Sequence, residues 1–295
     1  MQEVARDYAR WGRPLEVTVA EFLALDRLPD GLVTIASDDR RVELPILVHN
    51  RRAAASFVGF HAAMNPKLRR PLPFLQGRGV APRSLNTLLL GDPSLYLHDA
   101  VRVGWFLGNR SMALTELLPA ILDHADRLMG ARARLLWGCS AGGTAALRYA
   151  REQDTAVAIN PQTIVHRFTR GRWQPWLEHG WGITERAEEA PFLAAHADLT
   201  TAPIAPGRVV YVQNVRDDHL ATHMAPFAAA HGMPIVAGDH GRFRIELDDW
   251  GDGHTPPPAA WQKGLLADEA ERRLGTAAGP WAAIRHRLRG WLHKR

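Results

Sequence analysis

Residues 133–150 constrain the fold of this chain more than any other stretch. A short apolar run, Leu135–Trp137, is followed at once by the sequence GCSAGG (138–143) and then by a helix-forming segment that ends at Ala150. Strand, tight turn and helix therefore succeed one another without a spare residue. A serine in a Gly-x-Ser-x-Gly pattern at such a turn is typical of an enzymatic nucleophile, so the stretch predicts that role for Ser140.

Two glycines and a helix start explain why this turn suits a nucleophile. Gly138 and Gly142 have no Cβ, so the backbone is free to fold sharply on both sides of the serine. The helix that opens at Ala141 directs unpaired N–H groups at the site, and the Ala141 N–H is predicted to stabilise an oxyanion formed there. The alternative is a glycine-rich turn that only packs or that binds phosphate.

Composition and charge narrow the class of protein. The 295-residue chain has one cysteine, Cys139, which excludes a disulfide framework. Because it precedes Ser140, its side chain is expected to turn into the sheet and to be structural. The formal net charge is +5, and five basic residues fall among the last fifteen, which contain no acid. The remainder is neutral, so nucleic acid is not an expected partner.

The apolar runs and the first residues of the sequence indicate where in the cell the protein is expected. No apolar run approaches the roughly 20 residues of a membrane-spanning helix. The first residues also lack the apolar core of a signal peptide. We therefore expect a cytoplasmic protein, or one held peripherally at the inner membrane surface.

Apolar strands alternate with helical segments from residue 55 onward. Strands are predicted at 55–60, 85–90, 135–137, 155–159, 208–212 and 243–247. Apolar residues at helical spacing predict a helix that ends at Gly130. This alternation predicts an α/β fold in which a mostly parallel sheet is flanked by helices.

Three segments are expected around this sheet. Residues 1–54 predict a small β-rich segment, an antiparallel ribbon that either begins the main sheet or stands beside it, with Pro45 on an edge strand. The main domain spans 55–279 and contains a lid at about 163–206, whose aromatic side chains either line a pocket or form the lid's own core. Residues 280–295 predict a basic amphipathic helix. It docks on a membrane surface or a partner protein, or packs on the main domain.

Two later loops supply partners for Ser140. A serine hydroxyl needs a base within hydrogen-bond reach and a third group that orients the base. Asp217 follows the strand 208–212, and His254 lies in a Gly-Asp-Gly-His turn after the final strand. The order serine, acid, histidine predicts a catalytic triad, with Asp218 as the alternative acid.

Neighbouring histidines raise the question of a metal. His219 and His223 are spaced as on one helix face, and together with Asp217 they resemble a set of metal ligands. A metal site would leave the serine turn without a role. No metal and no other cofactor is therefore expected.

The loop after the strand 55–60 is a candidate for the rest of the oxyanion hole. It begins His61-Ala62-Ala63, and small residues there allow the backbone to approach a substrate. The N–H of Ala62 or Ala63 is predicted to be the second donor. A plain exit from the strand is the alternative.

Taken together, the serine turn, the order of strands and the late Gly-x-Gly-His sequence resemble the α/β-hydrolase superfamily over residues 55–265. Shorter runs resemble poorly characterised bacterial serine-hydrolase-like proteins, some of them near surface-glycan or secretion genes: GDPSL (91–95), WFLG (105–108), NPQT (160–163), QN (213–214) and GHTPP (253–257). The resemblance implies an α/β-hydrolase-type fold. Where familiar members have a His-Gly-Gly-type loop, this chain has His-Ala-Ala at 61–63.

The sequence predicts a serine hydrolase. It would act as an esterase or deacylase and cleave a carboxylic ester or an acylated glycan through an acyl-enzyme on Ser140. A small-molecule or glycan ester is the expected substrate. Two alternatives remain open. One is an acyltransferase that uses the same triad, and the other is a non-catalytic binding or assembly protein of this fold, linked to surface-glycan or secretion machinery.

Overall fold

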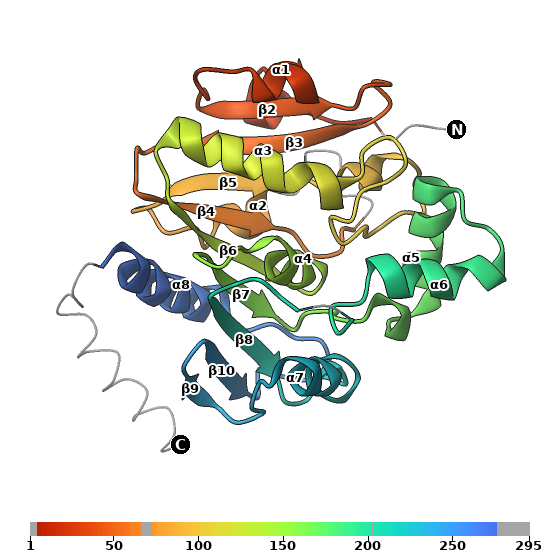
Figure 1. Cartoon of the computed structure of the whole chain (residues 1–295), viewed down its shortest axis with the longest axis vertical. Helices are drawn as coiled ribbons and strands as arrows, with labels where there is room; N and C mark the ends of the chain where they lie inside the picture. The colour runs from red at the N-terminus through yellow and green to blue at the C-terminus, as the bar shows by residue number, and fades with distance from the viewer. Residues whose placement is uncertain (1–4, 66–71, 73, 202, 276–295) are drawn as a thin grey trace.

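One mixed sheet organises the chain. The computed structural model describes residues 5–65, 72, 74–201 and 203–275. Within these residues ten strands hydrogen-bond in the order β1-β2-β3-β5-β4-β6-β7-β8-β10-β9 (Figure 1). The strands are β1 (Leu15–Thr18), β2 (Gly31–Ala36), β3 (Glu43–His49), β4 (Ala55–Phe60), β5 (Asn86–Leu90), β6 (Ala133–Cys139), β7 (Thr155–Ile159), β8 (Arg208–Asn214), β9 (Gly238–His240) and β10 (Phe243–Asp248).

Most neighbouring strands run in the same direction. β5, β4, β6, β7, β8 and β10 form a parallel block, and β1 and β2 share its direction. β3 is antiparallel to both of its neighbours, and β9 is antiparallel to β10. The predicted mostly parallel sheet is thus confirmed. The carboxyl ends of the parallel strands gather at one edge, where loops bring functional groups together.

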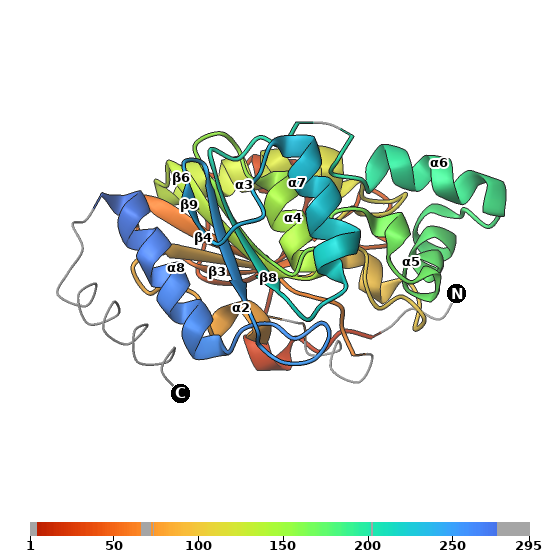
Figure 2. The same ribbon diagram turned by 90° about the horizontal axis from the view of Figure 1, so that it is seen from below.

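Helices cover both faces of the sheet (Figure 2). One face carries α1 (Val19–Leu23), α3 (Leu114–Met129), α4 (Ala141–Tyr149) and α7 (Ala225–His231), and the other carries α2 (Leu75–Arg78) and α8 (Ala259–Leu274). Successive side chains of a strand point to opposite faces, so in β4 Val58 packs in one core and Phe57 in the other. Burial on both faces explains why the strands are continuous apolar runs in the sequence.

The predicted helix before Gly130 is α3. Leu114, Leu118 and Ile121 lie on its buried face at helical spacing. Gly130 ends the helix in the left-handed conformation, with φ of 75°, which glycine adopts without a steric penalty.

The first strands belong to the main sheet rather than to a ribbon beside it. β2 and β3 are antiparallel, as predicted, but β1 is parallel to β2. The expectation of an edge strand at Pro45 is wrong, because β3 pairs with β2 on one side and with β5 on the other. The β3–β5 ladder begins at Ile46. Pro45 therefore lies past the end of β5, and on that side its missing N–H interrupts no ladder.

The stretch 163–206 is a largely helical excursion between β7 and β8 (Figure 1). It contains α5 (Arg170–Trp176), a π-helical turn (Leu177–Trp181) and α6 (Arg186–His196). Trp176 is fully buried, and its ring centroid lies 6.4 Å from that of Trp181 and 6.1 Å from that of Phe192. These aromatic side chains pack against one another, and through Trp105, whose ring centroid lies 5.9 Å from that of Trp176, they join the core on one face of the sheet.

The last segment of the chain remains at the level of prediction. Residues 280–295, with the expected basic amphipathic helix, lie outside the described residues. No described helix combines the length and the apolarity that crossing a membrane requires.

Candidate active site

Ser140 lies at the sharp turn between β6 and α4. Its backbone has φ 55° and ψ −120°, a conformation that residues with a side chain seldom adopt. Two glycines relieve the crowding: a Cβ on Gly138 would lie 2.2 Å from the carbonyl carbon of Gly142, and one on Gly142 would lie 2.3 Å from the carbonyl oxygen of Phe60. The predicted turn therefore forms, with β4, β6 and α4 meeting around the serine.

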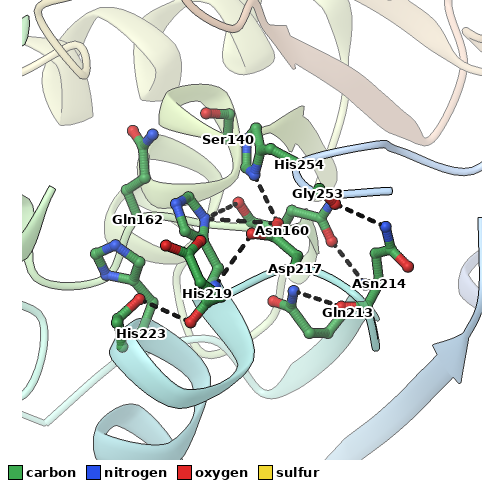
Figure 3. Close-up of polar contacts among 12 residues, drawn as sticks. Ser140, Asn160, Gln162, Gln213, Asn214, Asp217, His219, His223, Gly253 and His254 are labelled. Atoms are coloured by element: carbon green, nitrogen blue, oxygen red, sulfur yellow. Dashed lines mark hydrogen bonds and ion pairs between the residues drawn. The ribbon is translucent and has the colours of Figure 1, made fainter. Parts of the chain in front are cut away.

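Asp217 and His254 form a close polar pair at the same edge of the sheet. His254 Nδ1 lies 2.6 Å from Asp217 Oδ2, and the backbone N–H of His219 donates to Asp217 Oδ1 at 3.1 Å (Figure 3). Burial raises the pKa of Asp217, but these hydrogen bonds and the adjacent imidazoles outweigh it and hold the pKa at about 2. Asp217 is thus ionised at neutral pH. It accepts the Nδ1 proton of His254 and leaves the Nε2 lone pair of that ring free.

The structure distinguishes between the two candidate acids. Asp218 is exposed, and its carboxylate has no hydrogen bond or ion pair within the described part of the chain. The carboxylate that meets His254 belongs to Asp217.

Ser140 lies beside His254 without a hydrogen bond to it. Figure 3 shows the two residues next to each other, and no interaction joins the Ser140 hydroxyl to the imidazole. Ser140 is 6% exposed, whereas the His254 side chain is 39% exposed. Hydrogen bonds between nucleophile and base are often long before substrate binds, so this arrangement is compatible with the predicted triad.

Two buried asparagines hold the loop that carries this histidine. Asn214, the last residue of β8, donates through Nδ2 to the carbonyls of Gly251 at 2.7 Å and Gly253 at 2.8 Å. Asn160 donates to the carbonyl of Thr255 at 3.1 Å, and its Oδ1 accepts the Asn214 N–H at 2.8 Å. Sequence reasoning assigned neither residue a role. The available signal was their position at the ends of two adjacent parallel strands.

Two further imidazoles lie next to His254, and neither ring pair is stacked. The ring centroid of His219 lies 4.3 Å from that of His254 and 4.4 Å from that of His223. Burial lowers the pKa of His219 and lowers the pKa of His223 to about 3. Both rings are therefore neutral at neutral pH and place no competing positive charge beside Asp217.

The ligand set predicted for a metal was Asp217, His219 and His223, whereas the structure groups Asp217 and His219 with His254. Asp217, His219 and His254 offer three ligand atoms within 4.8 Å of one another. Zinc holds such atoms about 2.0–2.2 Å from the ion, which in tetrahedral geometry separates them by roughly 3.3 Å. His254 Nδ1 and Asp217 Oδ2 are 2.6 Å apart, the distance of a charge-assisted hydrogen bond. These atoms fit a shared proton better than an ion, and the absence of a metal stays a prediction.

Comparisons with known proteins bear on the fold. Neither a protein-family model nor a curated protein sequence matches the chain. Among solved structures, the acetyl xylan esterase from Paenibacillus sp. R4 superposes with a TM-score of 0.52 at 15% identity, covering 81% of this chain and 83% of that one. A puromycin hydrolase superposes with a TM-score of 0.52 at 16% identity, over 84% of this chain and 40% of its own. Dipeptidyl peptidase 4 of Porphyromonas gingivalis gives 0.52 at 11%, over 84% and 35%.

This chain has the α/β-hydrolase fold. The sheet order, the serine turn after β6 and the loops after β8 and β10 all agree with that conclusion. At these identities the comparison establishes the α/β-hydrolase fold alone.

Two backbone segments were predicted to donate to an oxyanion at Ser140, the loop after β4 and the start of α4. The Ala62 N–H donates to Gln76 Oε1 at 2.8 Å, so α2 occupies this predicted donor. Ala63 is exposed, and its N–H has no partner among the described residues. The Ala141 N–H lies in the first turn of α4, where N–H groups have no partner within the helix. Ala63 and Ala141 are thus the donors left open.

Two other reactive side chains near the serine turn, those of Cys139 and His61, are not available as a nucleophile or a base. Desolvation raises the pKa of the Cys139 thiol to about 12, so no thiolate forms at neutral pH. His61 Nε2 accepts the Asp92 N–H at 3.0 Å, and His61 Nδ1 donates to the Ala62 carbonyl at 2.7 Å. Burial lowers the pKa of His61 to about 4. Both ring nitrogens are therefore engaged, and the ring is structural.

Proposed function

We propose that the protein is a serine hydrolase that acts on a carboxylic ester or an acylated glycan through an acyl-enzyme on Ser140. The observation that carries the proposal is the presence, at one sheet edge, of a strained serine turn and an ionised Asp217 hydrogen-bonded to His254. Strained backbone at a residue with a side chain persists only where the surroundings enforce it, and such residues cluster at active sites. The expected substrate is a small-molecule or glycan ester.

The reaction follows from the tautomer of His254. Its Nε2 takes the hydroxyl proton as Ser140 Oγ attacks the ester carbonyl carbon, and Asp217 stabilises the imidazolium. The tetrahedral intermediate then breaks its bond to the alkoxy oxygen, which leaves as an alcohol with the proton from Nε2. Water repeats the sequence on the acyl-enzyme, and the carboxylic acid leaves with Ser140 restored.

The charge that develops on the carbonyl oxygen requires donors already in place. The open N–H groups are those of Ala141, in the first turn of α4, and of Ala63, in the loop after β4. Fixed backbone donors of this kind need no reorganisation during the reaction, and losing one costs about 10²–10³ in kcat in enzymes that use them.

Labelling with a fluorophosphonate probe tests the proposal. The folded wild type is expected to form an adduct that peptide mass mapping places on Ser140, and Ser140→Ala to form none. His254→Ala should slow labelling by about 10³-fold or more. His240→Ala changes an exposed histidine on β9 and is the matched control, with wild-type labelling expected. A folded wild type that is not labelled, or labelling that His254→Ala leaves unchanged, would contradict the proposal.

Product analysis separates hydrolysis from acyl transfer, because both use the same acyl-enzyme. An activated acetate ester is offered together with glycerol and free sugars as competing acceptors. Free acetate as the main product supports the hydrolase, whereas acetylated acceptor in excess over acetate shows a transferase.

A further inference from the structure

Gln162 lies at the same sheet edge as Ser140 and has an unused hydrogen-bond donor. It follows β7 and is 1% exposed. Its Oε1 accepts the indole N–H of Trp105 at 2.6 Å, and because an indole nitrogen only donates, this bond fixes which way the amide faces. The Nε2 group donates to nothing among the residues that the structure describes.

The backbone of Gln162 is tied to the helix that Ser140 begins. Its N–H donates to Thr144 Oγ1 at 3.1 Å, and its carbonyl accepts from the same hydroxyl at 2.9 Å. Thr144 in turn donates its own N–H to the Ser140 carbonyl at 3.2 Å. Gln162 therefore packs against the first turn of α4, and Figure 3 shows its amide on the side toward which the Ser140 hydroxyl points.

A strained turn presents Trp105 to Gln162. Trp105 and Phe106 have φ values of 51° and 55°, in a region that aromatic residues seldom occupy. Asp92 Oδ2 accepts the Phe106 N–H at 2.9 Å, and the Tyr149 hydroxyl donates to the Phe106 carbonyl at 2.5 Å. These two bonds hold the turn in its strained conformation. The turn orients the Gln162 amide through the indole N–H of Trp105.

Gln162 and the open loop donor follow strands on opposite sides of β6. β4 and β7 flank β6 on its two sides. Ala63 follows β4, whereas Gln162 follows β7. A carbonyl oxygen bound by Ala63 and Ala141 is thus directed toward the β4 side, and the Gln162 donor remains for a different oxygen of the substrate.

We propose that Gln162 Nε2 donates a hydrogen bond to a second substrate oxygen next to the scissile ester, and that it selects oxygen-rich esters over hydrocarbon ones. The inference rests on the proposed serine-hydrolase function. A site built around a buried donor rejects an analogue that lacks the acceptor, because the donor then stays unpaired. The acceptor belongs either to the alcohol, as in a sugar ester, or to an oxygen-bearing acyl group.

Two pairs of esters that exchange one oxygen for CH₂ test the proposal. The acyl pair is p-nitrophenyl methoxyacetate and p-nitrophenyl butyrate, and the alcohol pair is 2-methoxyethyl acetate and butyl acetate. The quantity compared is the ratio of wild-type to variant kcat/KM for each ester, because intrinsic reactivity cancels in this ratio. A general loss of structure would lower both members of a pair equally.

Gln162→Glu keeps an oxygen for the Trp105 N–H and replaces the Nε2 donor by an acceptor. It is expected to lower kcat/KM about tenfold for the oxygen-bearing member of one pair, and to change the hydrocarbon member by less than about threefold. The pair affected identifies the side of the ester that carries the acceptor.

Trp105→Phe and Trp176→Phe provide a matched comparison. Both indoles are fully buried, their centroids are 5.9 Å apart, and each donates one hydrogen bond. Trp176 donates to the Gly108 carbonyl rather than to Gln162. Trp105→Phe frees the amide to turn and is expected to reduce the same preference, whereas Trp176→Phe should retain it.

The possible outcomes distinguish a failure of the Gln162 role from a failure of the proposed hydrolase function. Equal losses for both members of each pair in Gln162→Glu, or an unchanged preference, would overturn the role of Gln162 while labelling of Ser140 left the serine hydrolase standing. A wild type that turns over none of the four esters and resists the fluorophosphonate would refute the hydrolase itself, and the inference with it.

Discussion

Asn160 accepts the backbone N–H of Asn214 through its side-chain oxygen at 2.8 Å, which joins the ends of β7 and β8. Both residues are buried, and both side-chain amides donate to the loop after β10. His254, in that loop, is partly exposed, and its ring contacts His219 and Asp217 on its buried side. The two amides hold the backbone on both sides of His254 and so help to position its ring over the sheet edge.

Asn214→Ala should impair the site more than the fold. It removes the donor to the Gly251 and Gly253 carbonyls, so the loop loses its anchor, and fluorophosphonate labelling is expected to slow by tenfold or more, about the factor that follows from a misplaced base. Asn86→Ala is the matched control, because Asn86 is equally buried and bonds Arg51 and Ala53 at the amino end of β5. If both variants lose stability alike and label alike, the anchoring role is refuted.

Substitution of Asp217 should slow fluorophosphonate labelling strongly, whereas substitution of the adjacent Asp218 should leave its rate nearly unchanged. Asp217→Asn replaces the acceptor of the His254 Nδ1 proton, so the ring is free to adopt the wrong tautomer, and the rate is expected to fall about 10³–10⁴-fold. Asp218→Asn alters an exposed carboxylate that has no hydrogen bond or ion pair among the described residues, and it should leave the rate within about twofold, as surface changes usually do. Rates of phosphonylation at saturating probe distinguish the two. Equal losses would show that Asp217 has no special part.

Gly142→Ala should disrupt the serine turn. The added Cβ would lie 2.3 Å from the Phe60 carbonyl oxygen and 2.9 Å from that of His61, so either β4 or α4 must move. We expect a loss of about 2 kcal/mol or more in unfolding free energy, together with loss of labelling. Gly171→Ala, in α5, meets nothing within 4 Å and should be neutral or stabilising by up to about 1 kcal/mol. Urea unfolding curves measure both, and a stable, active Gly142→Ala would disprove the packing argument.

Acid should destabilise the protein through His61. Its folded pKa is about 4 against 6.5 for a free imidazole, so between these values the unfolded chain binds a proton that the folded chain excludes. Stability is therefore lost as the pH falls from 6.5 to about 4, by about 3 kcal/mol for this group. His61→Gln should reduce the slope of unfolding free energy against pH by about one proton.

His166→Gln changes an exposed histidine and serves as the control for this slope. Urea titrations at several pH values between 4 and 7 provide the measurement, with slopes compared rather than absolute stabilities. An unchanged slope in His61→Gln would mean that His61 is not the group that resists protonation.

The parts of the site that depend on local sequence were predictable. The turn at Ser140 follows from its glycines and from the strand and helix on either side, all within one short stretch. Asp217 and His254 follow from the order of strands, although sequence alone left Asp218 open because adjacent loop residues differ only in direction. The Asn214 contacts and the Trp105–Gln162 bond join residues far apart in the chain, and no local pattern encodes such pairs.

The fold, too, has parts that local sequence specifies and parts that depend on contacts between distant residues. β4 and β7 have the predicted bounds, because apolar runs closed by turn residues specify buried strands locally. The parallel pairing of β1 with β2 depends on a crossover through α1 that residue patterns did not reveal. α8 was not predicted, since it buries a charged residue: Glu269 is 1% exposed and is paired with Arg208 at 2.8 Å and with Arg244 at 2.9 Å. A glutamate ordinarily indicates a solvent-facing position.

The antiparallel strand β3 has a consequence for the folding of the chain, because it covers a strand edge that would otherwise be open. It covers the hydrogen-bonding edge of β5, whose Leu88, Leu89 and Leu90 are buried. A chain that began at residue 55 would expose that edge, a flat row of unpaired backbone groups between apolar side chains. Such an edge is a template for strand exchange between molecules. By pairing with β5, the N-terminal segment therefore closes that edge to strands of other molecules.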